Sequence, residues 1–173
     1  MRILKIIIIS LLTIVAILLI LAIFVPKDFR AEANIIIEKP KQEVYDFVKM
    51  IENQDKFGVW FQKDPNIKKI KEGIDGTEGF MYRWESEVVG NGSQTITHLI
   101  DGNLVETELD FGFGEPGKGY FMLDKIDSNT TSVTWGVAGK TPYPLNLMSL
   151  FYDMNKDFET GLENLKNVLQ NKD

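Results

Sequence analysis

The sequence predicts an α+β fold, in which a curved antiparallel sheet of about seven strands wraps round a long C-terminal helix and a single transmembrane helix precedes both. Three features support this prediction. Residues 6–25 are apolar and uncharged. Residues 65–139 alternate short apolar and polar runs between glycine-rich turns. From residue 147 onward, apolar side chains recur at helical spacing.

Length and composition limit the classes of protein to be considered. The 173 residues contain no internal repeat and fit a membrane anchor, residues 1–26, followed by one folded domain, residues 27–173. A hydrophobic fraction of 44% with 25% charged residues excludes wholesale disorder. Because the chain has no cysteine and a single histidine, it has no disulfide, no thiolate metal site and no multi-histidine site. We expect no metal and no cofactor.

The first element is the apolar run from Ile6 to Val25, in which Ser10 and Thr13 are the only polar side chains. At ~1.5 Å per residue, a helix over this run spans ~30 Å, which is the hydrocarbon thickness of a bilayer. The membrane is therefore the first expected partner, contacted through residues 6–25.

A cleaved signal peptide is the alternative interpretation of this run. Arg2 and Lys5 form a positive N-terminal region, and Ala31-Glu32-Ala33 has the small-x-small form of a cleavage site. However, the run is longer than the ~7–15 apolar residues of a signal peptide, and charged residues separate it from Ala33. We favour a retained anchor, with a short N-terminal tail inside and the domain on the extracytoplasmic side of the membrane.

The domain after the anchor is acidic. Residues 26–173 contain 17 basic and 25 acidic side chains, a net charge of −8. Lys68, Lys69 and Lys71 form a short basic strip, which is typical of a solvated strand and turn. Because nucleic acid attracts clustered basic faces, we expect no nucleic-acid partner. We expect a monomer that its anchor holds at the membrane.

The domain is expected to begin with a strand at residues 33–38, because three β-branched isoleucines lie there and Lys39-Pro40 follows as a breaker. A short amphipathic helix comes next, since Pro40 suits the first turn of a helix. Residues 53–61 have irregular spacing, and their aromatic density indicates a buried connection. The apolar residues of the short helix are Val44, Phe47, Val48 and Ile51.

Ten of the fourteen glycines lie between Gly73 and Gly119, where they separate short runs of alternating polarity. This is the pattern of an antiparallel meander with hairpin turns. The six strands expected here are Asn66–Glu72, Gly79–Val88, Ser93–Ile100, Leu104–Phe113, Gly119–Ile126 and Thr131–Ala138.

The final segment changes to a helical period. Its apolar residues fall at gaps of 4, 3, 4, 4, 3 and 4, which predicts one stripe along a long helix. A sheet that curls round such a helix often leaves a concave apolar interior, the usual form of a small-molecule pocket. The stripe consists of Leu147, Phe151, Met154, Phe158, Leu162, Leu165 and Leu169.

Several short motifs, in this order and spacing, carry a resemblance to a known family. They are Ile35-Ile36-Ile37-Glu38-Lys39-Pro40 with Glu43-Val44-Tyr45, Gly79 to Trp84, Val89-Gly90-Asn91-Gly92, Thr95-Ile96-Thr97, Ser132-Val133-Thr134-Trp135 and the run from Phe158 to Lys166. Together they resemble the polyketide cyclase/dehydrase-type branch of the SRPBCC superfamily, which has the START-like helix-grip fold. The resemblance covers nearly all of residues 29–170. It implies the fold but no single activity, since similar proteins include lipid carriers, metabolite binders and cyclases.

An enzymatic role would need a polar group that faces the cavity. On the strand 93–100, alternation groups Gln94, Ile96, His98 and Ile100 on the more apolar face, which predicts that His98 points inward. An imidazole there could act as a general base near neutral pH. Similar family members often carry an acidic residue at the matching place, so His98 departs from the common pattern. The alternative is a hydrogen-bonded histidine at a sheet or cavity edge.

Two further patterns are interpreted as structural. Glu106, Glu108 and Asp110 alternate against apolar neighbours, which favours a solvated carboxylate row over a metal site. Residues 112–119 have the G-x-x-x-x-G-K spacing of a phosphate-binding loop, but Gly119 replaces the required Ser/Thr and a strand-like run follows. We interpret this segment as a flexible loop at a pocket rim.

The candidate pocket residues come from the inward strand positions and the C-terminal stripe, with residues 147–158 on the lid side. Core packing is the alternative interpretation of the same aromatic residues. Three of them, Tyr82, His98 and Trp135, would supply the polar contacts. The full set is Tyr82, Trp84, Ile96, His98, Leu109, Phe111, Val133, Trp135, Phe151, Met154 and Phe158.

The function that best fits these observations is a membrane-tethered module that binds a hydrophobic or amphipathic small molecule, either a lipid or a polyketide-like compound. A cyclase- or dehydrase-type enzyme that uses His98 is the first alternative. A ligand-free envelope interaction module is the second, and a filled core with an exposed apolar patch would favour it.

Overall fold

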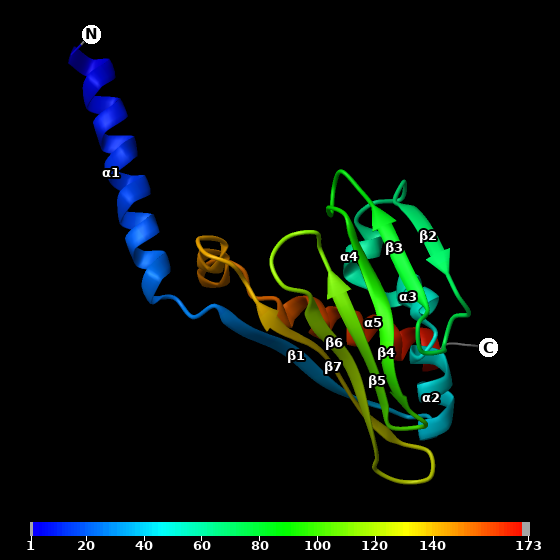
Figure 1. The fold of residues 1–173 in the computed structure, drawn as a ribbon. Helices are drawn as coiled ribbons and strands as arrows, with labels where there is room; N and C mark the ends of the chain where they lie inside the picture. Colours follow the sequence, from blue (N-terminus) through cyan, green and yellow to red (C-terminus); the bar gives the residue numbers. More distant parts are fainter. Residues whose placement is uncertain (1, 171–173) are drawn as a thin grey trace.

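The computed structural model describes residues 2–170, so residue 1 and residues 171–173, at the outer ends of the two expected segments, lie outside the described residues. The chain starts with a long helix, α1 (Arg2–Phe24), which extends away from the rest of the molecule (Figure 1). The other helical elements are α2 (Lys41–Val48), η1 (Ile51–Asn53), α3 (Gln54–Phe57), α4 (Val59–Gln62), η2 (Leu145–Leu150) and α5 (Asn155–Gln170). The strands are β1 (Asp28–Ile37), β2 (Lys68–Glu72), β3 (Met81–Glu85), β4 (Gly92–Ile100), β5 (Leu104–Asp110), β6 (Gly117–Lys125) and β7 (Thr131–Lys140).

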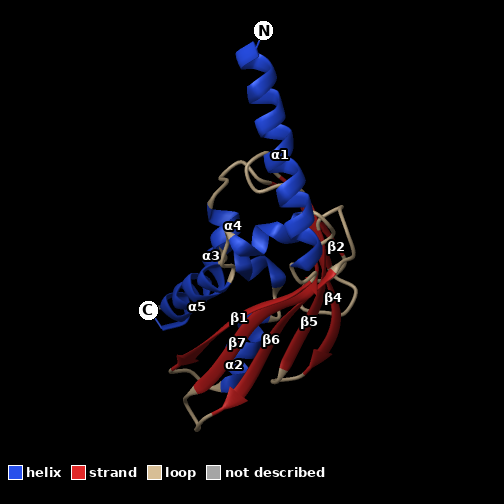
Figure 2. Ribbon diagram, turned by 90° about the vertical axis from the view of Figure 1, so that its left-hand side faces the viewer, coloured by secondary structure: helices blue, strands red, loops and turns tan. Residues whose placement is uncertain are grey.

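The seven strands form one antiparallel sheet in the order β1-β7-β6-β5-β4-β3-β2. The N-terminal strand β1 pairs with β7 from Asp28–Lys140 at one end to Ile37–Thr131 at the other. The sheet curves, and α5 lies along its concave side (Figures 1 and 2). The predicted α+β fold, a seven-strand curved sheet wrapped round a C-terminal helix and preceded by an apolar helix, is confirmed.

The C-terminal helix begins later than the apolar stripe that predicted it. The N–H of Asn155 donates to Asp153 Oδ1 at 3.1 Å, and α5 starts there. Leu147 lies in η2 instead, and Phe151 follows η2 with 82% of its side chain exposed. The prediction of one helix from Leu147 onward is therefore wrong for these two residues. Helical spacing of apolar residues does not distinguish one long helix from two consecutive segments whose apolar faces contact different parts of the molecule.

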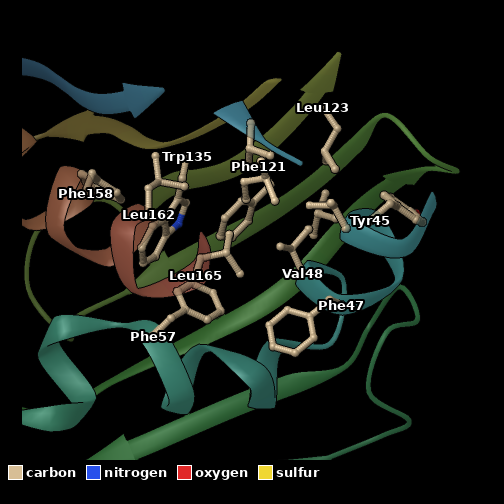
Figure 3. Close-up of a cluster of buried hydrophobic side chains, with 14 of the residues drawn as sticks. Tyr45, Phe47, Val48, Phe57, Phe121, Leu123, Trp135, Phe158, Leu162 and Leu165 are labelled. Carbon is tan, nitrogen blue, oxygen red and sulfur yellow. The ribbon is translucent and has the colours of Figure 1, made fainter. Parts of the chain in front are cut away.

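The main core lies between the sheet and the helices α2, α3 and α5 (Figure 3). Trp135 of β7 stacks on Phe121 of β6, with ring centroids 5.0 Å apart and ring planes at 11°, while Phe57 and Phe158 meet Trp135 edge-on. Such aromatic pairs stabilise a core beyond the area they bury. Gly161 allows α5 to approach this cluster, because a Cβ there would lie 2.4 Å from the Trp135 ring.

Candidate ligand cavity

A cavity of about 660 Å³ lies between the concave face of the sheet, α4 and the start of α5. This volume falls within the ~300–1,000 Å³ of typical small-molecule sites. Its walls are mainly apolar and aromatic, as is usual for such sites. The aromatic side chains that line it are Phe29, Trp60, Phe61, Trp84, Phe111, Phe113, Trp135, Tyr152 and Phe158.

The inner wall is built from rings that hold one another in place. Trp60, Trp135 and Phe158 meet edge-to-face in all three pairs, with ring centroids 5.0–5.8 Å apart. Phe61 of α4 meets Trp84 of β3 in the same manner at 5.6 Å. Edge-to-face pairs are a favoured aromatic geometry, so these walls are formed before any ligand enters.

Two buried amides supply the polar contacts of the inner cavity. Gln94 of β4 is buried, and its Nε2 donates to Thr107 Oγ1 at 3.1 Å. Gln54 of α3 is only 4% exposed, and its Nε2 has no acceptor among residues 2–170. Buried donors are normally paired with protein or water. Gln54 therefore offers a free donor beside the cavity to an oxygen of a bound molecule.

Charged and hydroxyl side chains lie at the mouth of the cavity. Lys140 and Glu115 are 3.7 Å apart there, and both are well exposed. Ser149 and Tyr152 line the same mouth on the side of η2. The cavity thus combines an aromatic interior with a polar rim, which suits a ligand that has an apolar body and a polar end.

The structure brings together six of the candidate pocket residues and places the other five elsewhere. Trp84, Leu109, Phe111, Trp135, Met154 and Phe158 line the cavity. Ile96 and Val133 are buried in the core away from it. Tyr82 is also fully buried, and its hydroxyl donates to Asp55 at 2.9 Å. Burial, followed by this hydrogen bond, raises the pKa of Tyr82. Phe151 is exposed and does not line the cavity.

His98 lies on the outer face, in contrast to the orientation predicted from strand alternation. The pairing of β4 with β5 shifts at Thr97, so that Ile96 faces Thr107 whereas His98 faces Glu106. This bulge adds one residue and reverses the inward and outward positions that follow it. Leu99 packs against the core instead, while the half-exposed His98 places Nδ1 3.1 Å from Glu78 Oε1. The backbone N–H of Leu99, and then His98, lowers the pKa of Glu78.

Several cavity residues were missed by the sequence interpretation. Gln54, Trp60 and Phe61 come from the irregular stretch 53–61, whose aromatic density indicated a buried connection without indicating a cavity wall. Met148 and Tyr152 come from the segment expected to be helical. Among the described residues, no group of three His, Asp or Glu side chains is arranged to hold a metal ion.

The fold is shared with solved structures of low sequence identity. The Aha1 dimer from Colwellia psychrerythraea is 16% identical, with a TM-score of 0.58 over 83% of this chain and 97% of that one. Norcoclaurine synthase from Thalictrum flavum is 6% identical, with a TM-score of 0.65 over 86% of this chain and 97% of that one. A second structure of that enzyme, in complex with dopamine and hydroxybenzaldehyde, is 7% identical, with a TM-score of 0.62 over 87% of this chain and 91% of that one.

These similarities show that the chain has a helix-grip fold. At such identities a shared fold does not define an activity. The sequence matches no protein-family model and no curated protein.

Proposed function

We propose that this chain is a membrane-tethered binding protein that holds a hydrophobic or amphipathic small molecule, a lipid or a polyketide-like compound, between the sheet and α5. The main support is the cavity of about 660 Å³, which has aromatic walls and the free amide donor of Gln54 beside it. Norcoclaurine synthase, which has the same fold, is described in complex with two small aromatic molecules. The motifs that resemble the polyketide cyclase/dehydrase-type branch agree with a ligand of this class.

Binding is proposed rather than turnover, because the side chains buried beside the cavity cannot act as an acid or a base. The buried polar side chains of the cavity, Gln54 and Gln94, are amides and do not titrate. His98, the candidate general base, lies outside the cavity beside Glu78. A general base must lie within hydrogen-bond reach of the proton that it removes.

The tether in this proposal is α1, which is long and apolar enough to cross a bilayer. A helix of this kind at the N-terminus passes the same test when it is a signal sequence. Retention is favoured by contacts with the domain, since the side chain of Asn146 donates to the carbonyl oxygens of Ala22 and Val25 at 2.8 Å. We propose a single span with the domain on the extracytoplasmic side.

Native mass spectrometry of the full chain, released from detergent micelles, tests the binding proposal. Leu109→Trp should fill the cavity, because Leu109 lines it. Leu104→Trp is the matched control, since Leu104 lies on the same strand, is half-buried and does not line the cavity. We expect an added mass on the wild type and on Leu104→Trp, and its loss from Leu109→Trp.

Two results would contradict this proposal. An added mass equal in all three proteins would indicate lipid bound around α1 rather than in the cavity. A bare mass for the wild type, unchanged by a panel of lipids and aromatic metabolites, would favour the ligand-free interaction module.

A further inference from the structure

The segment between β7 and α5 is attached to the end of α1. Asn146 of η2 is 1% exposed, and its Nδ2 donates to the carbonyl oxygens of both Ala22 and Val25 at 2.8 Å. The hydroxyl of Tyr143 donates to the carbonyl oxygen of Leu19 at 3.1 Å. The carbonyl of Ala22 is one of the last four of α1, which have no partner within the helix. Here the domain supplies a partner, and its hydrogen bonds fix η2 beside the last turns of α1.

These hydrogen bonds determine the depth of η2 relative to a bilayer. Val25 ends the apolar run, and Leu19 lies six residues earlier, which at ~1.5 Å per residue is ~9 Å inside it. If residues 6–25 span the hydrocarbon core, the hydrogen bond between Tyr143 and Leu19 lies inside that core. Only residues 25–27 separate α1 from β1, so the domain has little freedom to move away.

The side chains of this segment suit that depth. Residues 141–152 contain no charged residue. Phe151 is 82% exposed, and Met148 and Leu150 are about 60% exposed, although all three are apolar. Tyr143 and Tyr152 are exposed as well, and tyrosine is enriched where a membrane meets water. An uncharged apolar surface continuous with a membrane helix matches the boundary between lipid headgroups and acyl chains.

We propose that residues 143–152 lie in the interface of the bilayer that α1 spans, and that the mouth of the cavity opens onto that bilayer. This inference rests on the tether proposed above. Leu145, Met148 and Tyr152 line the cavity as well as belonging to this segment. A hydrophobic ligand therefore passes between the acyl chains and the cavity along this uncharged side of the mouth, without crossing water.

The test uses the absence of cysteine from the chain, which makes a single introduced cysteine unambiguous to label. The full chain is reconstituted in phosphatidylcholine vesicles that contain spin-labelled phosphatidylcholine. A polarity-sensitive fluorophore is attached to Val15→Cys in α1, to Phe151→Cys, or to Ile126→Cys. Ile126 is a matched apolar control, since it is half-exposed in the turn between β6 and β7, at the end of the sheet away from α1 (Figure 1).

We expect the labels at positions 15 and 151 to lose most of their emission to the lipid quencher, with emission maxima shifted to shorter wavelength. The label at position 126 should behave as it does in buffer. Strong quenching at position 15 with none at position 151 would overturn this inference and leave the tether intact. No quenching at position 15 would reject the tether and the inference together, whereas cavity binding is tested separately through Leu109→Trp. Met148→Cys repeats the measurement at a second exposed position.

Discussion

Gln54 and Gln94 form a matched pair of buried cavity side chains that differ in one hydrogen bond. Gln94 Nε2 donates to Thr107, whereas Gln54 Nε2 has no acceptor among the described residues. A buried unpaired donor costs ~1–3 kcal/mol, and a satisfied hydrogen bond contributes ~1 kcal/mol. We expect Gln54→Met to raise the free energy of unfolding of the ligand-free chain by ~1 kcal/mol, and Gln94→Met to lower it by a similar amount. Denaturant titration measures both, and equal destabilisation by the two changes would contradict the assignment of Gln54 as unpaired.

Gly161 is the residue that brings α5 close to Trp135. In an isolated helix, alanine is more favourable than glycine by ~1 kcal/mol. Here the added Cβ would lie 2.4 Å from the ring of Trp135, and overpacking of this kind costs ~1–3 kcal/mol. We therefore expect Gly161→Ala to destabilise the fold and to perturb the near-ultraviolet circular dichroism of the tryptophans. Thr160→Ala, at an exposed neighbouring position, is the control. Stabilisation by Gly161→Ala would show that Trp135 moves aside without cost.

At the scale of elements, the outer face of the sheet holds a polar row across three strands. Glu32 of β1, Gly136 of β7 and Tyr120 of β6 are in register. A Cβ at Gly136 would lie within 2.7 Å of both neighbouring side chains, so glycine lets the Tyr120 hydroxyl reach over β7 and donate to Glu32 at 2.6 Å. That hydrogen bond, and then Arg30, holds the pKa of Glu32 below its ordinary value.

The lowered pKa of Glu32 makes the contribution of this row dependent on pH. A carboxylate with a lowered pKa in the folded state stabilises the fold above its unfolded pKa, and this contribution is lost as pH falls through the folded pKa. We expect Glu32→Gln to lower the urea midpoint at pH 7, with the gap from the wild type closing as pH falls through the lowered pKa of Glu32. The effect should be small, because Glu32 is partly solvent-exposed. A gap that is constant with pH would show that the ionised form of Glu32 is not what stabilises the row.

Element by element, the sequence is informative wherever one periodicity persists. Alternation located the six strands from β2 to β7, consecutive isoleucines located the second half of β1, and the stripe at Phe158, Leu162, Leu165 and Leu169 located α5. The bulge at Thr97 could not be found in this way, since the extra residue leaves composition unchanged while it turns His98 outward and Leu99 inward. The contact between η2 and α1 could not be predicted either. The apolar residues Leu147 and Phe151 continue the helical spacing of α5, although η2 lies beside α1.

Cavity walls were harder to predict than the core, for a physical reason. Both are built from inward-facing apolar side chains, and only the three-dimensional distance between elements decides which of them leave space. Trp84 and Tyr82 lie on the same face of β3. Trp84 lines the cavity, whereas Tyr82 is fully buried outside it and its hydroxyl donates to Asp55. The aromatic pair Trp60 and Phe61 gave no periodic pattern at all, because it lies in the short helix α4.

For the whole molecule, binding and stability are linked. A ligand that binds only the folded state stabilises it by ~2.7 kcal/mol at one hundred times its Kd, which for a domain of this size raises Tm by ~5–11 °C. We expect such a rise when oleate, as an amphipathic probe, is added to the full chain in phosphatidylcholine nanodiscs. The cavity is where this energy would arise, so Leu109→Trp should abolish the rise while Leu104→Trp retains it. A rise of equal size in all three proteins would place the effect in the bilayer instead. No rise in the wild type at saturating oleate would mean that the cavity does not accept a single long acyl chain, which leaves the polyketide-like class as the ligand to test.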